Sequence, residues 1–505
     1  MTGLTLAQVV AFLPGASLEG DASLSVMAVT ADSQQVDAGV IFVAVEGTRS
    51  DGHQYLDHAL KQGAVAVVVK TSFMGKIRPG AIVIRCQDTR PVPALIARAL
   101  AENPDEKLWT TAVTGTNGKT TTAFLIQEML NQLHGPCGLL GTIRYDDGRT
   151  QTVAPLTTPG GPVFYKILGQ MVENGCRSVA MELSSHALDQ QRTAGLGLDV
   201  ALITNLGRDH LDYHSDMDSY LEAKAKIRNL LRRDAKSGGA GKPGIFAINV
   251  GDEGLRNLAQ TSSHVLRFCA EPTCEVEAEL KVVEAELSLR GTSLKLLWQD
   301  GDLSLESPLV GRFNVENLTA AMAVGLALGL EGQMCAEALA GVDQVPGRLE
   351  RFVLPNGAVA VVDYAHTHDA LAAVLDTCTE LTEGRMLVVF GCGGDRDRGK
   401  RALMAEVAAN SSDAVWITSD NPRSEDPAAI CQEIWQGYRA VTNPRALSCE
   451  IEVDRKSAIE GALAAALPGD VVVVAGKGHE DYQLVGDQVL HLDDREIVRD
   501  WAESA

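Results

Sequence analysis

Several kinds of signal are missing from this chain of 505 residues. Its ten cysteines are scattered, without the CxxC pairs of zinc or redox motifs, which is typical of free, mostly buried thiols in a reducing compartment. No apolar run approaches the roughly 18 residues of a membrane-spanning helix. The N-terminus lacks a basic region followed by an apolar core and a cleavage site, so no signal peptide is expected. These absences predict a cytoplasmic protein without membrane insertion.

Positive charge is also scarce. The chain has 44 basic and 66 acidic residues and a net charge of −22, which argues against nonspecific binding to nucleic acid or anionic membranes. Local basic clusters are more informative on such a background, because an anionic substrate needs them. The hydrophobic content of 45% and charged content of 22% are ordinary for a globular protein, and the length predicts two to four domains.

The stretch that organises the chain is Gly-Thr-Asn-Gly-Lys-Thr-Thr at 115–121. A β-prone stretch over 108–112 precedes it and a stretch with helical spacing follows, which predicts a loop between a buried strand and a helix N-terminus. Backbone N–H groups and the helix dipole bind phosphate there, Lys119 can reach β- and γ-phosphates, and Thr120 offers a hydroxyl to Mg²⁺. The match to GxxxxGK[ST] is imperfect, because Val113 replaces the first glycine; the alternative is a chance Gly-Lys-Thr in a glycine-rich turn. The flanking elements favour ATP binding.

Polar clusters follow two other predicted strands of the same unit. Residues 179–182 form a strand that ends in Glu182, and residues 201–205 form one followed by Asp-His-Leu-Asp at 209–212. Ligands of open parallel sheets gather at the carboxyl ends of strands, so Glu182 and His210 are candidates for contact with Mg²⁺ or the γ-phosphate. The alternative for an acid in this position is a helix cap. The alternation of strands and helices predicts an α/β fold with a parallel sheet.

Other segments offer weaker signals. Asp32-Ser33 and Asp51-Gly52-His53, in a small α/β unit that ends near residue 107, are more typical of turns than of a site when taken alone. Lys224 borders the apolar stripe of a predicted helix over 219–230, and its ordinary interpretation is a surface lysine. The glycine-rich loop over 237–244 has no predicted role.

The last unit has four predicted strands, each followed by a polar loop. The strands cover 358–362, 385–390, 414–418 and 471–475, and the loops begin at Asp363, Gly391, Ser419 and Gly476. Four such loops on one sheet edge describe a binding surface, although each alone is also compatible with a simple turn.

In their order along the chain, these motifs resemble those of the Mur ligases, ATP-dependent amide-forming enzymes of peptidoglycan precursor synthesis. The motifs are Asp-Ser-Gln at 32–34, the loop at 115–121, Leu-Thr-Thr-Pro at 156–159, Met-Glu-Leu-Ser-Ser-His-Ala-Leu at 181–188, Asp-His-Leu-Asp at 209–212, Gly-Arg-Phe-Asn-Val-Glu-Asn at 311–317, Pro-Gly-Arg-Leu-Glu at 346–350 and Asp-Tyr-Ala-His-Thr at 363–367. The resemblance implies an α/β protein of three domains. Residues 1–107 are expected to bind the UDP end of the substrate, 108–345 to form a central P-loop-type parallel-sheet ATPase domain, and 346–505 to form a Rossmann-like domain for the incoming amino acid.

The resemblance also implies roles for individual residues. The expected ATP site is Gly115, Thr116, Asn117, Gly118, Lys119, Thr120, Thr121, Asn317, Arg348 and Asp363. The expected contacts to a UDP-N-acetylmuramoyl-dipeptide are Ser33, Thr157, Thr158, Ser184, Gln190 and Arg192. The expected catalytic residues are Lys119, Glu182, His210 and Lys224, and those expected around Mg²⁺ are Thr120, Glu182, His210 and Lys224. In this family the lysine that Lys224 matches is carried as a carbamate, which converts a cation into an anionic oxygen donor.

The Asp-Asn-Pro-Arg loop at 420–423 is similar to that of family members that add meso-diaminopimelate, whereas lysine-adding relatives generally lack the arginine. The expected amino-acid site is Arg396, Asp420, Asn421, Pro422, Arg423, Gly476 and Glu480. The implied reaction joins meso-diaminopimelate to the D-glutamate γ-carboxylate of UDP-N-acetylmuramoyl-L-alanyl-D-glutamate through an acyl phosphate, in a protein expected to be a monomer. The alternatives are the L-lysine-adding counterpart, a folylpolyglutamate synthase-like ligase, and an ATP-driven switch protein.

Three positions depart from the family pattern. His368 stands where proline is usual, Gln34 replaces the arginine of Asp-Ser-Arg, and Leu156 stands where many relatives have a polar residue. These departures concern contacts to the nucleotide and to uridine, not the reaction.

Overall fold

The computed structural model describes residues 3–47, 50–209, 213–233, 242–288, 290–299 and 301–504. Its internal contacts divide the chain into two compact units. The first contains the chain up to Val283 together with Leu296–Leu303 and Glu316–Leu339, and the second contains Glu284–Lys295, Ser304–Val315 and Ala340–Ala505. The domain boundaries after residues 107 and 345 stay a prediction. In the described ranges, no helix has both the length and the apolar character needed to cross a membrane.

The first unit begins with a five-stranded sheet of order β2-β7-β6-β5-β4, in which only β2 is antiparallel to its neighbour. Its strands are β2 (Ser17–Glu19), β4 (Ala28–Thr30), β5 (Val40–Val43), β6 (Ala66–Lys70) and β7 (Val83–Cys86), with the pair β1 (Leu4–Thr5) and β3 (Ser25–Val26) and the helices α1 (Leu6–Phe12), α2 (Leu56–Gln62) and α3 (Val92–Leu100). Asp32 and Asp51 each accept a backbone hydrogen bond two residues on, from Gln34 N at 2.9 Å and His53 N at 3.0 Å. The turn interpretation of both motifs is therefore confirmed.

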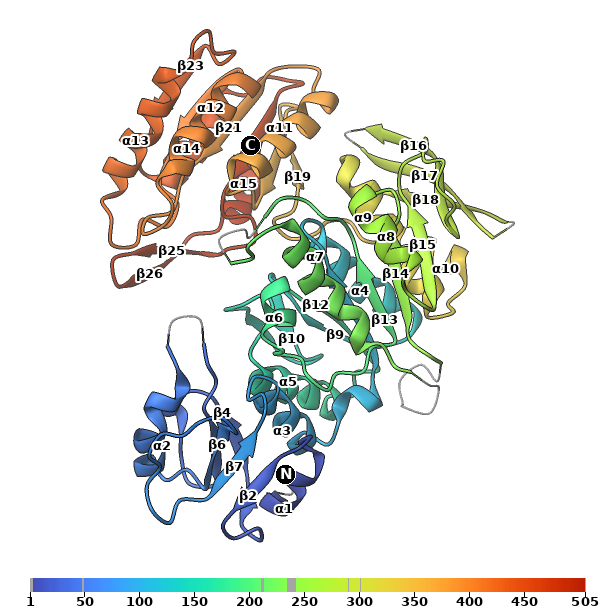
Figure 1. Ribbon diagram of the computed structural model, residues 1–505. Coiled ribbons are helices and arrows are strands. Elements are labelled where there is room, and N and C mark those ends of the chain that lie inside the picture. Colours follow the sequence, from blue (N-terminus) through green and yellow to red (C-terminus); the bar gives the residue numbers. More distant parts are fainter. Residues whose placement is uncertain are drawn as a thin grey trace. The chain divides into compact units, whose positions relative to one another are not determined.

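A second, larger sheet has its parallel core in the first unit, with the order β9-β12-β8-β13-β14-β15 (Figure 1). Its strands are β8 (Trp109–Thr114), β9 (Cys137–Leu140), β12 (Ser178–Glu182), β13 (Val200–Ile203), β14 (Ile245–Asn249) and β15 (Val265–Cys269), with β10 (Arg144–Asp146) and β11 (Gln151–Val153) at one edge and β16 (Leu280–Ser288), β17 (Gly291–Trp298) and β18 (Gly301–Ser307) beyond β15. The helices are α4 (Lys119–Leu133), α5 (Gly161–Glu173), α6 (Ser185–Asp189), α7 (Met217–Ala225), α8 (Glu253–Gln260), α9 (Arg312–Ala327) and α10 (Gly332–Ala340). The central position of β8 places the loop after it between the carboxyl ends of β12 and β13.

The sheet of the second unit has the order β19-β20-β24-β21-β22-β23, parallel except for β19. Its elements are β19 (Glu350–Val353), β20 (Val359–Asp363), α11 (His368–Leu381), β21 (Met386–Phe390), α12 (Gly399–Ser411), β22 (Ala414–Ile417), α13 (Pro427–Ala440), β23 (Ser448–Ile451), α14 (Arg455–Ala465), β24 (Val471–Ala475), the hairpin β25 (Tyr482–Val485) and β26 (Gln488–His491), and α15 (Asp494–Ser504).

Both faces of this sheet are covered. Alternate residues of β24 pack into two separate cores, Val473 with residues of α11, α12 and α13, and Val472 and Val474 with residues of α14 and α15. This explains why β24 is apolar throughout, as expected of a buried parallel strand. Because β24 lies between β20 and β21, the loops after all three strands meet at a point where the connections change face, which is where α/β sheets bind ligands.

Candidate functional site

The loop after β8 forms a cradle for an anion at the start of α4. Gly118, at the helix N-cap, has a φ of 81°, and Gly115 has a φ of 148°, with Thr204 so close that a Cβ at Gly115 would lie 1.9 Å from its Oγ1. Glycine is therefore required at both positions. Lys119 Nζ donates to the carbonyls of Gly115 and Thr116 at 3.0 and 2.7 Å, which keeps its ammonium over the loop. The predicted strand, turn and helix are all confirmed.

Neighbouring strands and one helix fix the shape of this loop. Thr204 and Asn205 follow β13: Asn205 accepts a hydrogen bond from Asn117 N at 2.8 Å, and Thr204 Oγ1 donates to Asn117 O at 2.7 Å. Asn317 on α9 accepts from Thr122 Oγ1 at 3.2 Å and lies beside Gly118. Thus Asn317 is brought to the phosphate loop from nearly 200 residues away in sequence, and the loop carbonyls and amides are held before any ligand arrives.

Glu182, the last residue of β12, points at the same loop. Its Oε2 accepts from Thr120 Oγ1 at 2.9 Å, and Thr142 donates to both carboxylate oxygens, from its N at 2.6 Å to Oε1 and from its Oγ1 at 3.1 Å to Oε2. The side chain is buried. The helix-cap alternative is wrong, because Ser184 caps α6 by accepting from Ala187 N at 3.2 Å. A carboxylate and a hydroxyl beside a phosphate cradle are the hard oxygen donors that Mg²⁺ prefers.

Lys224 reaches this site from α7, and its interpretation as a surface lysine is wrong. The residue is only 1% exposed, its Nζ donates to Gly115 O at 2.6 Å, and Nζ lies 4.2 Å from the centre of the Tyr220 ring. Burial, aided by the nearby ammonium of Lys119, lowers the pKa of Lys224 from its ordinary value to about 6. The helix predicted over 219–230 ends at Ala225 and a 3₁₀ turn follows, while Tyr220, Ala223 and Ile227 of its predicted apolar stripe are buried. His210 lies outside the described residues.

Five of the six residues expected at the UDP substrate are connected to Glu182 by one network. Thr158 Oγ1 donates to Glu182 O at 2.7 Å and accepts from Ser184 N at 3.1 Å, and Arg192 Nη1 donates to Thr158 O at 2.9 Å. Arg192 also donates to Gln190 Oε1, at 3.0 Å from Nε and 2.8 Å from Nη2. Thr157 joins through Thr142, with 3.0 Å between the two hydroxyls.

Ser33, the sixth, lies apart in the turn after β4 and is buried. No contact among the described residues joins it to this network.

Two residues expected at the nucleotide lie in the second unit. Asp363, at the end of β20, accepts from Leu349 N and Ala365 N at 2.8 Å each, and burial raises the pKa of its carboxyl. Arg348 lies over the ring of Tyr364, 4.8 Å from its centre. The structure therefore places this pair beside each other at the same sheet edge.

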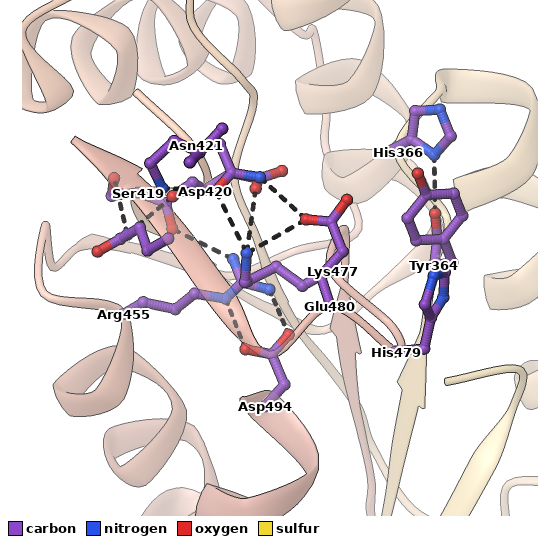
Figure 2. Close-up of polar contacts among 12 residues, drawn as sticks. Tyr364, His366, Ser419, Asp420, Asn421, Arg455, Lys477, His479, Glu480 and Asp494 are labelled. Atoms are coloured by element: carbon purple, nitrogen blue, oxygen red, sulfur yellow. Dashed lines mark hydrogen bonds and ion pairs between the residues drawn. The ribbon is translucent and has the colours of Figure 1, made fainter. Parts of the chain in front are cut away.

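The loops after β22 and β24 form the candidate amino-acid site (Figure 2). Asn421 Nδ2 donates to Glu480 Oε2 at 2.9 Å, which joins the two loops. Gly476, with a φ of 121°, passes so close to Asp420 that a Cβ there would lie 3.3 Å from its Oδ2. The Asp-Asn-Pro-Arg motif and the Gly-Lys-Gly-His-Glu motif thus meet, as their place at the same edge of one parallel sheet predicts, although β21 lies between β22 and β24.

Arg423 follows Pro422 in the left-handed region, with a φ of 53°. Its backbone pairs with the β25–β26 hairpin, donating to Leu484 O at 2.9 Å and accepting from Gly486 N at 2.7 Å, while Nη1 donates to Gly394 O at 2.9 Å. Arg396 on the loop after β21 is exposed and donates to Asp395 O at 3.4 Å. Non-glycine residues in this region are uncommon and cluster at functional sites.

Three family models match the chain: "Mur ligase family, catalytic domain" over residues 25–98, "Mur ligase middle domain" over 113–325, and "Mur ligase, glutamate ligase domain" over 347–478. A curated relative from Geobacter metallireducens, named UDP-N-acetylmuramoyl-L-alanyl-D-glutamate–2,6-diaminopimelate ligase, is 41% identical over an alignment of 493 residues that covers 95% of this chain and 94% of the relative. The chain belongs to the Mur ligase family.

Solved structures agree with this Mur ligase assignment. A structure of a UDP-N-acetylmuramoyl-L-alanyl-D-glutamate–2,6-diaminopimelate ligase is 31% identical, has a TM-score of 0.69, and is matched over 100% of this chain and 99% of that chain. A Mycobacterium tuberculosis folylpolyglutamate synthase, with a TM-score of 0.58 over 76% of this chain, is 19% identical and shares the fold alone. The predicted α/β fold and the resemblance to the family are confirmed.

Sequence reasoning missed several polar residues at the two Mur ligase sites. Thr142 donates hydrogen bonds to Glu182, and Lys477 is fully buried among the loops after β22 and β24, called here the amino-acid loops. Arg455 and Asp494 form a buried pair next to these loops. Lys477 alone carried a signal, because it stands in the same short motif as Gly476 and Glu480. The other three lie outside the motifs, and only the fold brings them to the sites.

Proposed function

We propose that this Mur ligase joins meso-diaminopimelate to the D-glutamate γ-carboxylate of UDP-N-acetylmuramoyl-L-alanyl-D-glutamate, using ATP and Mg²⁺. The observation that carries the proposal is the meeting of the Asp-Asn-Pro-Arg loop with Glu480, through the 2.9 Å hydrogen bond from Asn421. It places an arginine, a carboxylate and an amide together, which matches an amino acid that bears a carboxylate and an ammonium at its distal end. The relatives named UDP-N-acetylmuramoyl-L-alanyl-D-glutamate–2,6-diaminopimelate ligase, which match this chain over nearly its full length, support this substrate assignment.

In the first step, an oxygen of the γ-carboxylate attacks the γ-phosphorus of ATP, ADP leaves, and an acyl phosphate forms. The loop amides at 115–118 and the ammonium of Lys119 would stabilise the phosphate oxygens. Thr121, in the first turn of α4, would contact the same phosphates. Thr120 and Glu182 would hold Mg²⁺, and His210 and a carbamylated Lys224 are the other two residues expected there from the sequence. A bound Mg²⁺ supplies positive charge against the transferred phosphoryl group.

In the second step, the neutral amine of meso-diaminopimelate attacks the acyl carbonyl, and phosphate leaves from the tetrahedral intermediate while the amine loses a proton. Arg423 and Arg396 would bind a carboxylate of the amino acid, and Glu480 would accept from its distal ammonium. No protein nucleophile takes part, because the activated group belongs to the substrate.

We also propose that Lys224 is carried as a carbamate. A lysine whose pKa is about 6 is mostly the neutral amine at neutral pH, and the neutral amine is the form that adds to CO₂. The product would replace this amine with an anionic group beside the loop after β8. The short hydrogen bond of Nζ to Gly115 O supports this role, because Gly115 belongs to the loop that would hold the phosphates.

The remaining parts of the proposal rest on the family. Residues 1–107, 108–345 and 346–505 would form the three domains, with Ser33, Thr157, Thr158, Ser184, Gln190 and Arg192 at the UDP substrate and Asn317, Arg348 and Asp363 at the nucleotide. The protein would act in the cytoplasm as a monomer.

Phosphate release is the direct test. Purified protein with ATP, Mg²⁺ and UDP-N-acetylmuramoyl-L-Ala-D-Glu is given meso-diaminopimelate or L-lysine in parallel reactions. Release that depends on diaminopimelate, with a product heavier by one residue, is expected. A preference for lysine would keep the ligase class and overturn the substrate, and release indifferent to both amines would favour an ATP-driven switch.

A further inference from the structure

Two cationic side chains, Arg455 and Lys477, are fully buried at the amino-acid loops of the second unit. Arg455 forms a bidentate ion pair. Its Nε and Nη2 each donate to an oxygen of Asp494 at 2.7 Å, and both side chains are 0% exposed. The guanidinium also donates to the carbonyls of Ser419 and Ala475, at 3.2 and 3.0 Å (Figure 2). This geometry satisfies both charges internally and leaves the pair neutral toward its surroundings.

The second buried cation, Lys477, is held much more loosely. Its side chain is also 0% exposed, yet Nζ lies 3.3 Å from Glu480 Oε2, 3.4 Å from Asn421 Oδ1 and 3.9 Å from Asp420 Oδ1. Its ammonium faces two carboxylates and forms a tight pair with neither (Figure 2). Lys477 is therefore a source of positive charge inside the site and not one half of a closed ion pair.

The carboxylates around Lys477 have capacity left for a ligand. Both donors to Glu480 within the described residues, Asn421 Nδ2 and Lys477 Nζ, reach Oε2, and the side chain is 17% exposed. The side chain of Asp420 is only 9% exposed, and its buried Oδ1 makes no hydrogen bond to the described residues. A buried acceptor without a donor is costly, so this arrangement favours a ligand that brings positively charged donors.

Stability does not explain a lysine in this position. Lysine is almost never fully buried, and a buried charge of imperfect geometry is often replaced by an apolar side chain without loss of stability. The side chain is also prevented from turning outward. Gly478, with a φ of 52°, passes so close to Tyr364 and Gly347 that a Cβ there would lie 2.7 Å from their atoms, which fixes the turn that carries Lys477 inward.

We propose that Lys477 is a specificity-determining residue, which favours an amino acid with a zwitterionic distal end over one whose distal end is only cationic. The inference rests on the proposed function. An ammonium bound by Glu480 is repelled by the adjacent ammonium of Lys477. In meso-diaminopimelate a distal carboxylate offsets this repulsion, whereas L-lysine has no such group. Lys477 therefore weakens the binding of L-lysine more than the binding of meso-diaminopimelate.

The test compares the ratio of kcat/KM for meso-diaminopimelate to kcat/KM for L-lysine in the intact enzyme. Lys477→Met and Lys477→Gln remove the charge, and Lys477→Arg keeps it. Both neutral variants are expected to lower the ratio by roughly ten-fold, while Lys477→Arg keeps it near the wild-type value. The matched control is Lys456→Met, the same change at a lysine whose side chain is 62% exposed in the same unit, which should leave the ratio unchanged.

Each outcome separates the inference from the proposed function. A wild type that ignores both amines overturns both. A wild type that uses diaminopimelate, with neutral variants that lose both substrates equally or that raise the KM for ATP by the same factor, overturns the inference alone. If the neutral variants do not fold, Asp420→Asn provides the opposite test. It removes a negative charge beside Lys477, so the ratio should rise, and a fall would contradict the assignment.

Discussion

Lys224 in the first unit and Lys477 in the second are both buried lysines, but their surroundings differ. Lys224 meets a backbone carbonyl, the face of an aromatic ring and another ammonium, and its pKa is lowered to about 6. Lys477 also lies over an aromatic ring, 5.4 Å from the centre of Tyr482, but it meets two carboxylates and an amide oxygen and no second ammonium within these contacts. Burial is common to both, so the neighbouring groups decide what each nitrogen does: one is made available as a neutral amine, the other contributes charge to a binding site.

Substitution of Lys224 should have the largest effect. Lys224→Met removes the nitrogen while keeping the apolar stem, and we expect the rate of diaminopimelate-dependent phosphate release to fall by about 1,000-fold, in the range for loss of a group that stabilises developing charge. The KM for the amino acid should change little, in contrast to substitution of Lys477. Lys226→Met, two residues away at a half-buried ion pair with Asp189, is the control. Similar loss in both variants would contradict a special role for Lys224.

Glu182→Gln tests the metal site of the first unit. Glutamine keeps the size of the side chain and an acceptor for Thr120, so the strand should fold, but it removes the negative charge that would hold Mg²⁺. The Mg²⁺ concentration for half-maximal rate should rise by about 10- to 100-fold, as for loss of groups that support a metal site. Glu173→Gln, an exposed position at the end of α5, is the matched control. An unchanged Mg²⁺ dependence would remove Glu182 from the metal site.

Arg423→Lys tests the amino-acid site of the second unit. Lysine keeps the charge but loses the fork that grips a carboxylate through two hydrogen bonds, so kcat/KM for meso-diaminopimelate should fall by about 10- to 100-fold. The KM for ATP should stay within about two-fold. Arg439→Lys, the same change at an exposed position on α13, provides the comparison. Unchanged kinetics in Arg423→Lys would exclude Arg423 from the site.

The phosphate loop could be predicted from sequence because its parts are contiguous: a strand, a glycine turn and a helix start follow one another within about a dozen residues. The convergence of the C-terminal loops could also be predicted, because parallel strands put their carboxyl ends at the same edge. Here the order of elements along the chain is enough to bring the residues together.

Lys224 and Lys477 could not be predicted from the residues alone. Helical periodicity puts Lys224 at the border of the apolar stripe, and its burial depends on contacts with Gly115 O, more than 100 residues away, and with the Tyr220 ring. For Lys477, the partners Asp420 and Asn421 are more than 50 residues away, and the inward turn of its side chain depends on the packing of Gly478. Such contacts have no local pattern in the sequence.

The smallest expected effect is a pH dependence of stability that arises from Lys224. The pKa of Lys224 is lowered to about 6 in the folded chain, while an unfolded lysine titrates near 10.4, so between these values the unfolded state binds one more proton. The free energy of unfolding should therefore rise with pH, by about 1.4 kcal/mol per pH unit from this group, and the gain should disappear as pH falls toward 6. Urea unfolding in CO₂-free buffer at pH 7 and pH 8.5 measures this slope in the wild type, Lys224→Met and Lys477→Met. Lys224→Met should lose this part of the slope, and Lys477→Met should keep it. If the slope survives in Lys224→Met, Lys224 is not the neutral amine that carbamylation requires.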